Sequence, residues 1–219
     1  MELAIDITEL KFNWDKHSSF ALNIPTWQVK TGQKLFLYGQ SGSGKSTLLN
    51  ILSGVISGYS GQLKVLGHEL NLLSASKRDQ FRANNIGMIF QQFNLLPYLS
   101  GIQNIQLGSY FCSKDKAKQA DLLTQLCEKL QLSAELLGQS ASQMSVGQQQ
   151  RIALVRALVN QPKLIIADEP TSALDSELRD QFIQLLLDCA QDSTVVFVSH
   201  DRGLAHHFSQ QVDLSSLIV

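Results

Sequence analysis

Short apolar runs alternate with stretches of helical periodicity along most of the chain. Runs bounded by polar residues or glycine predict buried strands, at residues 35–38, 86–90, 164–167 and 195–199. Apolar positions repeating every three or four residues predict amphipathic helices, at residues 47–52, 117–130, 146–159 and 177–189. Strands that are separated by helices favour a parallel, doubly wound α/β sheet.

Two segments depart from this alternation. Residues 91–143 contain helical patterns without a convincing strand, which predicts a helical insertion in the α/β core. The first 30 residues alternate in places and predict an antiparallel β region, with apolar side chains at Phe12, Trp14, Phe20, Leu22, Ile24, Trp27 and Val29. We therefore expect one domain over residues 1–219, with a core from residues 1–90 and 151–219 and a helical subdomain from residues 91–150.

Composition and charge narrow the class of protein. The 219 residues are 44% hydrophobic and 17% charged, which is typical of a folded globular chain. The 18 basic and 19 acidic residues nearly cancel and form no basic patch, so we expect no nucleic-acid partner. Cys112, Cys127 and Cys189 are odd in number and widely spaced, which is typical of reduced thiols in a cytosolic protein. The sequence shows no bilayer-spanning run and no signal peptide, which favours a cytoplasmic location.

The segment from Gly39 to Thr47 has the spacing of a phosphate-binding P-loop, at Gly39, Gln40, Ser41, Gly42, Ser43, Gly44, Lys45, Ser46 and Thr47. It follows a predicted strand and precedes a predicted helix. Its glycines allow backbone N–H groups to surround phosphate oxygens, and the helix N-terminus faces the same anion. Lys45 is expected to reach the β- and γ-phosphates, and Ser46 to ligate Mg²⁺. The alternative of a plain glycine turn before a helix is disfavoured by this order of elements.

Two carboxylates follow the strand at residues 164–167. Asp168 and Glu169 stand where ligands of open α/β sheets bind, at the carboxyl end of a strand. We expect Asp168 to hold the metal, and Glu169 to act as general base on the attacking water. An acidic turn without function is the competing interpretation, and the P-loop argues against it.

A third motif precedes the helix at residues 146–159. Ser145 and Gln148 have the spacing of a capping box, so the motif is explained in part by helix capping. The same helix N-terminus, with Gly147, also fits a second anion site aimed at a γ-phosphate. The two interpretations are compatible.

Taken together, these motifs resemble those of an ABC-transporter ATPase subunit across essentially the whole chain. Residues 39–47, 145–151 and 165–175 are similar to its Walker A, signature and Walker B/D-loop motifs, in the family's order. Val146 departs from the family's usual glycine. Valine keeps its N–H donor but is strained at positive φ, so we expect the site to work with valine if this position needs only helical φ.

The resemblance implies roles for further residues. His200, in the segment 195–201, is similar to the switch histidine that senses the γ-phosphate, and Gln91 to the glutamine that contacts metal and water. Trp14 resembles the aromatic residue that stacks on adenine, with Phe12 as the competing candidate. The implied cofactors are ATP and Mg²⁺, the metal being held by Ser46, Gln91 and Asp168. The implied assembly is a head-to-tail dimer in which each copy closes its signature over the other copy's ATP.

Residues 90–100 resemble the subgroup of lipoprotein-releasing, macrolide-efflux and cell-division ATPases. This implies a separate membrane permease bound through residues 91–105, a position on the inner face of the membrane, and export or extraction of a substrate. Phe93, Leu95, Leu96 and Tyr98 are expected either to form the permease groove or to pack inside the helical subdomain. Transmembrane signalling of the cell-division type is the alternative function. A soluble P-loop kinase is disfavoured by the signature motif, and an ABC-type DNA-repair ATPase by the lack of room for a long insertion.

Overall fold

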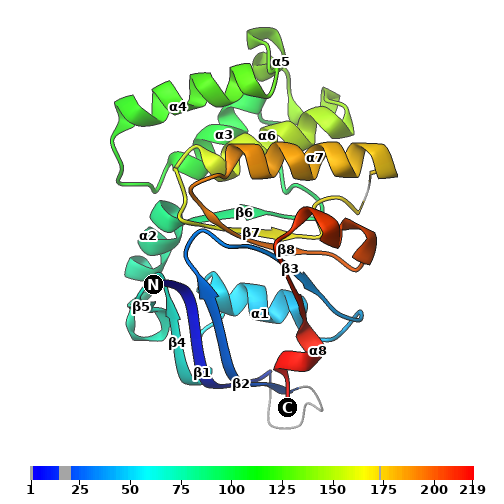
Figure 1. The fold of residues 1–219 in the computed structure, drawn as a ribbon. Helices are drawn as coiled ribbons and strands as arrows, with labels where there is room; N and C mark the ends of the chain where they lie inside the picture. The colour runs from blue at the N-terminus through cyan, green and yellow to red at the C-terminus, as the bar shows by residue number, and fades with distance from the viewer. Residues whose placement is uncertain (1, 15–20, 173) are drawn as a thin grey trace.

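The computed structural model describes residues 2–14, 21–172 and 174–219, so Phe20 and Ala173 lie outside the described residues. Two sheets and a layered set of helices form this part of the chain (Figure 1). Within these ranges, none of the helices is both long and apolar enough to cross a bilayer.

The larger sheet has five strands in the order β6-β7-β8-β3-β9, all paired in parallel. Its strands are β3 (Lys34–Tyr38), β6 (Ile86–Ile89), β7 (Leu164–Asp168), β8 (Thr194–Val198) and β9 (Gln210–Asp213). The four predicted strands are therefore confirmed to within one residue at each end. The edge strand β9 was not predicted, because Gln210, Gln211 and Asp213 give it no apolar run.

The smaller sheet is antiparallel, in the order β2-β1-β4-β5. The strands β1 (Leu3–Asn13) and β2 (Ala21–Lys30) confirm the predicted N-terminal β region, whereas β4 (Ser60–Val65) and β5 (His68–Glu69) come from later in the chain. Close approach of β1 to β4 requires a glycine in β4. A Cβ on Gly61 would lie 2.0 Å from the Glu9 carbonyl oxygen.

The helices cover both faces of the parallel sheet. They are α1 (Lys45–Leu52), α2 (Ala75–Asn85), α3 (Gly101–Ser109), α4 (Lys116–Lys129), α5 (Ala134–Gly138), α6 (Val146–Leu158), α7 (Ser176–Cys189) and α8 (Leu214–Leu217). Short 3₁₀ helices are η1 (Leu70–Leu72), η2 (Ala141–Gln143) and η3 (Arg202–His207).

In Figure 1, α1 lies between the parallel and antiparallel sheets, and α6 and α7 lie on the opposite face of the parallel sheet. The helices α3, α4 and α5 lie beyond α6 and α7. The helix α2 was not predicted, because Phe81 is its single buried residue.

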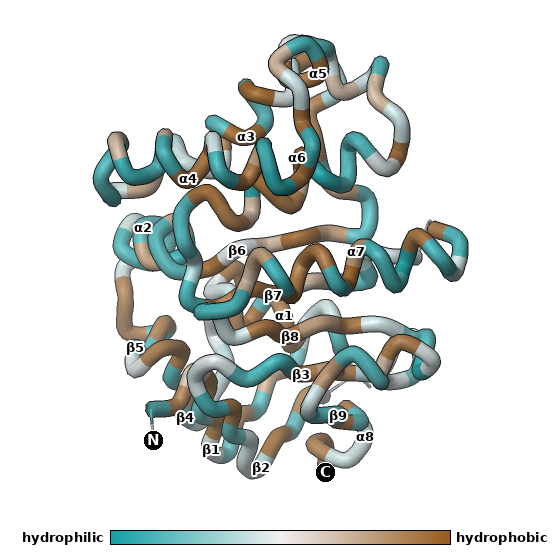
Figure 2. Tube along the Cα trace, turned by 45° about the horizontal axis from the view of Figure 1, so that its top comes forward, coloured by the Kyte–Doolittle hydropathy of each residue, from teal (hydrophilic) through white to brown (hydrophobic). Residues whose placement is uncertain are grey.

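Alternation along each central strand divides the core into two parts. In β3, Leu35 and Leu37 pack with α1 and the antiparallel sheet, whereas Phe36 packs on the side of α6 and α7. Parallel register sets Phe36 beside Phe197 of β8, with ring centroids 6.2 Å apart. In Figure 2 the tube is largely brown along β7 and β8, whereas it alternates between brown and teal along α4 and α7. A strand buried on both faces reads as an uninterrupted apolar run, which is why these strands were recognisable.

Candidate functional site

The carboxyl ends of four neighbouring strands meet at one edge of the parallel sheet. The glycine-rich loop follows β3, His200 follows β8, Asp168 ends β7, and Gln91 follows β6 by two residues. Because β6, β7, β8 and β3 are adjacent and parallel, these groups reach the same edge even though they are far apart in the sequence.

The loop between β3 and α1 takes a conformation that glycine favours. Gly42 and Gly44 have φ of 77° and 98°, and Gly44 immediately precedes α1. The helix begins at Lys45, two residues earlier than the apolar pattern indicated. The buried Lys45 ammonium donates to the carbonyl oxygens of Gly39 and Gln40 at 2.8 and 2.9 Å. A cation is therefore held within the loop, beside backbone N–H groups at a helix N-terminus.

Asp168 lies directly opposite the first turn of α1. The Ser46 hydroxyl donates to its Oδ2 at 3.2 Å, which joins the end of β7 to the loop after β3. Burial has the largest effect on the pKa of the Asp168 carboxyl and raises it, and the negative charge of Glu169 raises it further. The Ser46 hydrogen bond and the positive charge of Lys45 lower this pKa. The net direction is upward, so the carboxylate is held where its negative charge is unfavourable without a cation.

Glu169 adopts an unusual backbone conformation, with φ of 46°. Its N–H donates to the Val198 carbonyl at 2.9 Å, which fixes the turn against the end of β8. The His200 Nδ1 lies 2.9 Å from Glu169 Oε2. An ionised carboxylate only accepts hydrogen bonds, so Nδ1 carries the proton in this contact. A left-handed conformation at a non-glycine residue is a feature of functional sites, and here it aims the carboxylate at the histidine.

These groups surround one cavity of about 680 Å³. It is lined by Trp14, Ser41, Gly42, Gly44, Lys45, Ser46, Thr47, Gln91, Asp168 and Glu169. The Trp14 side chain is 60% exposed, whereas Phe12 is buried and contacts the Trp14 ring edge-on at a centroid distance of 5.2 Å. Of the two aromatic candidates, Trp14 is the one that borders the cavity.

The signature residues do not border this cavity in the same chain. Ser145 caps α6 by accepting from the Gln148 N–H, and the Gln148 side chain accepts from the Ser145 N–H at 2.8 Å, so the predicted capping box is present. Val146 is the first residue of α6 and is absent from the residues with positive φ, so it fits this position without strain. Gly147 borders a separate cavity, with Lys129 and Phe182.

The structure separates the two alternatives left open for the apolar residues of the segment 93–98. Phe93 is buried, Leu95 packs partly against the core, and Leu96 and Tyr98 are exposed. The Arg156 guanidinium of α6 donates to the carbonyls of Phe93 and Asn94, which holds the segment after Gln91 against the helix. No local pattern in the sequence indicates this contact, because Arg156 lies 63 residues from Phe93 along the chain.

Two positioning residues were also missed by the sequence analysis. Gln150 of α6 donates to the Pro170 carbonyl at 3.2 Å, and Arg179 of α7 pairs with Asp201 at 2.8 Å. Arg179 also donates to the Leu174 carbonyl, so it joins the loop before α7 to the segment after His200. A polar residue on a predicted helix gives no local signal of such long-range contacts.

A glycine-rich loop between a strand and a helix, facing an acidic strand end across one cavity, defines a P-loop nucleotide-binding protein. Comparison with solved structures gives the class more closely. The fold is similar to MJ0796 in a dimeric post-hydrolysis state of the ATP-binding cassette bound to ADP and Pi, with a TM-score of 0.79 and 29% identity over 95% of this chain and 93% of that chain.

The sequence matches the ABC transporter family profile over residues 22–172. It is 34% identical to the lipoprotein-releasing system ATP-binding protein LolD of Shewanella denitrificans, over 99% of this chain and 94% of that protein. It is 32% identical to the macrolide export ATP-binding/permease protein MacB of Mannheimia succiniciproducens, over 96% of this chain but 33% of that protein. The chain also spans 30% of the probable syringafactin export ATP-binding/permease protein SyfD of Pseudomonas syringae, at 37% identity. The chain belongs to the ABC transporter family and is its ATP-binding cassette.

Proposed function

We propose that this chain binds ATP with Mg²⁺ in the cavity described above and hydrolyses it within a dimer of two copies, energising a separate membrane permease. The observation that carries the proposal is the meeting of P-loop, Asp168, Glu169 and His200 at one sheet edge. Phosphoryl transfer depends mainly on positioning and charge stabilisation, and this edge offers both.

The donor set fits Mg²⁺. Ser46 Oγ and Asp168 Oδ2 are hard oxygen donors 3.2 Å apart, and Gln91 contributes a side-chain carbonyl to the same cavity. When bound, the ion supplies positive charge to the β- and γ-phosphate oxygens. The raised pKa of Asp168 supports this assignment, because desolvation of the half-buried carboxylate makes its negative charge unfavourable without a cation.

The remaining residues have separate roles in the proposed reaction. Lys45 exchanges its two carbonyl acceptors for phosphate oxygens. Glu169 accepts a proton from the attacking water, and His200 orients this carboxylate and contacts the γ-phosphate. Trp14 stacks on the adenine ring, supported from behind by Phe12.

A second copy of the chain completes the site. Ser145, Gly147 and Gln148 present a capped helix N-terminus away from their own chain's cavity, so they are free to approach the γ-phosphate bound by another copy. A dimeric structure of the MJ0796 cassette, at 30% identity and a TM-score of 0.78, supports this arrangement.

Residues 91–105, in the helical subdomain, are the proposed contact with the permease. Beside residues 91–105 lies a cavity of about 400 Å³ that includes Phe90, Asn94 and Phe111. Tyr98, Tyr110 and Phe111 are more than two-thirds exposed, and they offer apolar area to a partner helix. The similarity to LolD and MacB supports export or extraction of a substrate, with the cassette on the inner face of the membrane.

The substitution Glu169→Gln tests hydrolysis. It removes the proton acceptor but retains the shape and a hydrogen-bonding oxygen for His200. We expect ATP binding to persist, the ATP-bound dimer to accumulate, and kcat to fall about 10²- to 10⁴-fold. Steady-state phosphate release and size-exclusion chromatography with ATP measure both effects. The exposed Glu128→Gln on α4 is the control and should retain full activity, whereas normal turnover by Glu169→Gln would remove Glu169 from its proposed role.

Capture of the Glu169→Gln protein with ATP, from detergent-solubilised membranes of its native cell, tests the partner. A polytopic permease with a large extracytoplasmic domain is the expected companion. Cell-wall enzymes alongside a permease-like protein would favour transmembrane signalling. Repeated recovery of soluble proteins alone would contradict docking through residues 91–105.

A further inference from the structure

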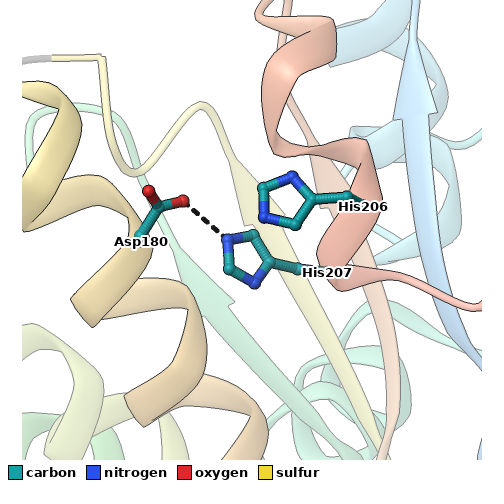
Figure 3. Close-up of side chains that lie close together, drawn as sticks. All are labelled: Asp180, His206 and His207. Carbon is teal, nitrogen blue, oxygen red and sulfur yellow. Dashed lines mark hydrogen bonds and ion pairs between the residues drawn. The ribbon is translucent and has the colours of Figure 1, made fainter.

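Two histidines and an aspartate form a cluster outside the nucleotide cavity. Asp180 projects from α7 toward His206 and His207, whose rings lie side by side on η3 (Figure 3). One ligand atom from each residue lies within 4.8 Å of the other two. The ring centroids of His206 and His207 are 4.0 Å apart. None of the three residues has a part in the proposed ATPase reaction.

The hydrogen bonds of the cluster prepare its nitrogen atoms for a metal. His206 Nδ1 lies 2.6 Å from the Gly203 carbonyl oxygen, which can only accept. This fixes the proton of a neutral ring on Nδ1 and leaves Nε2 with a free lone pair. A backbone carbonyl that orients an imidazole in this way is the usual outer partner of a metal-bound histidine.

The contact between His207 and Asp180 completes the donor set. His207 Nε2 lies 2.6 Å from Asp180 Oδ1, and the His207 side chain is 15% exposed. A cation can replace the proton between these two atoms, because both are ligands once that proton leaves. Two imidazoles and one carboxylate suit zinc and neighbouring transition metals, whereas magnesium prefers oxygen donors.

We propose that Asp180, His206 and His207 form a binding site for a divalent transition-metal ion of the zinc class, with solvent completing its coordination. The ion would join α7 to η3. The Arg179–Asp201 ion pair already links these two segments at 2.8 Å. η3 begins two residues after His200, and α7 follows Leu174 and Asp175 of the D-loop. Metal binding therefore fixes the segments that flank the nucleotide site without contacting nucleotide.

Zinc binding to the purified chain tests the site directly, with an excess of Mg²⁺ present to compete at Asp168 and Glu169. Competition against a chromophoric chelator gives the stoichiometry and the Kd. The wild-type chain should bind one zinc ion. The variants His206→Ala and Asp180→Asn should each bind zinc about 10- to 100-fold more weakly. Cobalt substitution should give visible bands without the thiolate charge-transfer band, which separates this site from one formed by cysteines.

Two matched variants control for general effects of removing a ring or a charge. His68→Ala removes an exposed imidazole on β5, and Asp188→Asn removes an exposed carboxylate on the same helix as Asp180. Both should bind zinc like the wild type. Equal zinc binding by wild type and His206→Ala, or displacement by Mg²⁺, would overturn the proposal and leave an ordinary His207–Asp180 hydrogen bond.

Thermal unfolding tests whether the zinc site belongs to the folded chain. With zinc at a hundredfold above Kd, the Tm of the wild type should rise by about 5–10 °C, and the Tm of His206→Ala should not. Absence of this rise in a wild type that does bind zinc would mean that the unfolded chain binds zinc equally well, which would contradict a site that is assembled by folding. Neither measurement depends on ATP hydrolysis, so the proposal succeeds or fails independently of the function proposed above.

Discussion

Asp168 shows at the scale of one residue how a binding site reduces the stability of the protein that carries it. Burial raises the pKa of its carboxyl, so the folded protein holds this proton more tightly than the unfolded chain does. Stability therefore falls as the pH rises from the usual aspartate pKa through the raised folded-state pKa. Once ionised, the carboxylate opposes folding until a cation reaches it.

The substitution Asp168→Asn should raise the Tm of the nucleotide-free protein by a few degrees at neutral pH, because a neutral amide still accepts from Ser46. The advantage should disappear below about pH 4, where Asp168 is protonated in both states. Thermal unfolding over a pH series, without Mg²⁺ or nucleotide, measures this difference. The exposed Asp188→Asn is the control, and a less stable Asp168→Asn at neutral pH would contradict the assignment.

Trp14 offers a second test at the residue scale. If its indole stacks on adenine, Trp14→Ala should weaken ATP binding by about 1–3 kcal/mol, or roughly 5- to 150-fold. Phe12→Leu should have a small effect, because Phe12 contacts the back of the indole and is buried. ATP should also quench the fluorescence of Trp14 while the buried Trp27 gives a constant signal. If both variants lost the same amount of ATP affinity, the result would contradict the assignment of adenine stacking to Trp14.

At the scale of elements, α3 and α6 begin in the same way. Ser100 and Gln103 form a capping box at α3, and Ser145 and Gln148 form one at α6. An N-cap hydroxyl contributes about 1 kcal/mol to stability whichever helix it caps. A function beyond capping must therefore appear as a difference between the two helices.

Replacement of either serine by alanine should lower the Tm by about 2–4 °C, as expected for about 1 kcal/mol in a chain of this size. Ser145→Ala alone should also reduce ATP-dependent dimerisation and hydrolysis, because its hydroxyl and helix N-terminus are proposed to face the partner's γ-phosphate. Calorimetry, size-exclusion chromatography and phosphate release on both variants compare the effects. Equal activity of the two would leave Ser145 as a helix cap only.

Two elements that the sequence did not predict, α2 and β9, share one physical property. α2 has one buried residue, and β9 is an edge strand of mostly polar residues, so neither carries an amphipathic pattern. Their place is decided by what they pair with: β9 hydrogen-bonds to β3, and α2 packs near β6. The central strands were predictable because burial on both faces demands apolar residues at every position.

At the scale of the whole molecule, the nucleotide cavity of one chain lacks the signature residues that the proposal requires. ATPase activity should therefore depend on encounter between two copies. At protein concentrations below the dimer Kd, the activity per milligram should rise in proportion to concentration and then level off. Phosphate release over a dilution series measures this. Activity per milligram that stays constant on dilution, with a monomer confirmed by light scattering, would contradict a shared site.

The local motifs were determined by the sequence itself. A P-loop needs its glycines, lysine and serine in one contiguous turn, and a capping box needs two residues three positions apart. Both motifs can therefore be recognised from the sequence alone. The ends of the central strands could also be recognised in the sequence, and they placed Asp168, Glu169 and His200 at one edge.

Tertiary structure alone decided the contacts between distant segments. It buried Phe93, joined the Phe93 carbonyl to Arg156, exposed Trp14 rather than Phe12 to the cavity, and brought Asp180 to His206 and His207. Such contacts depend on how whole elements pack, and no spacing along the chain records them.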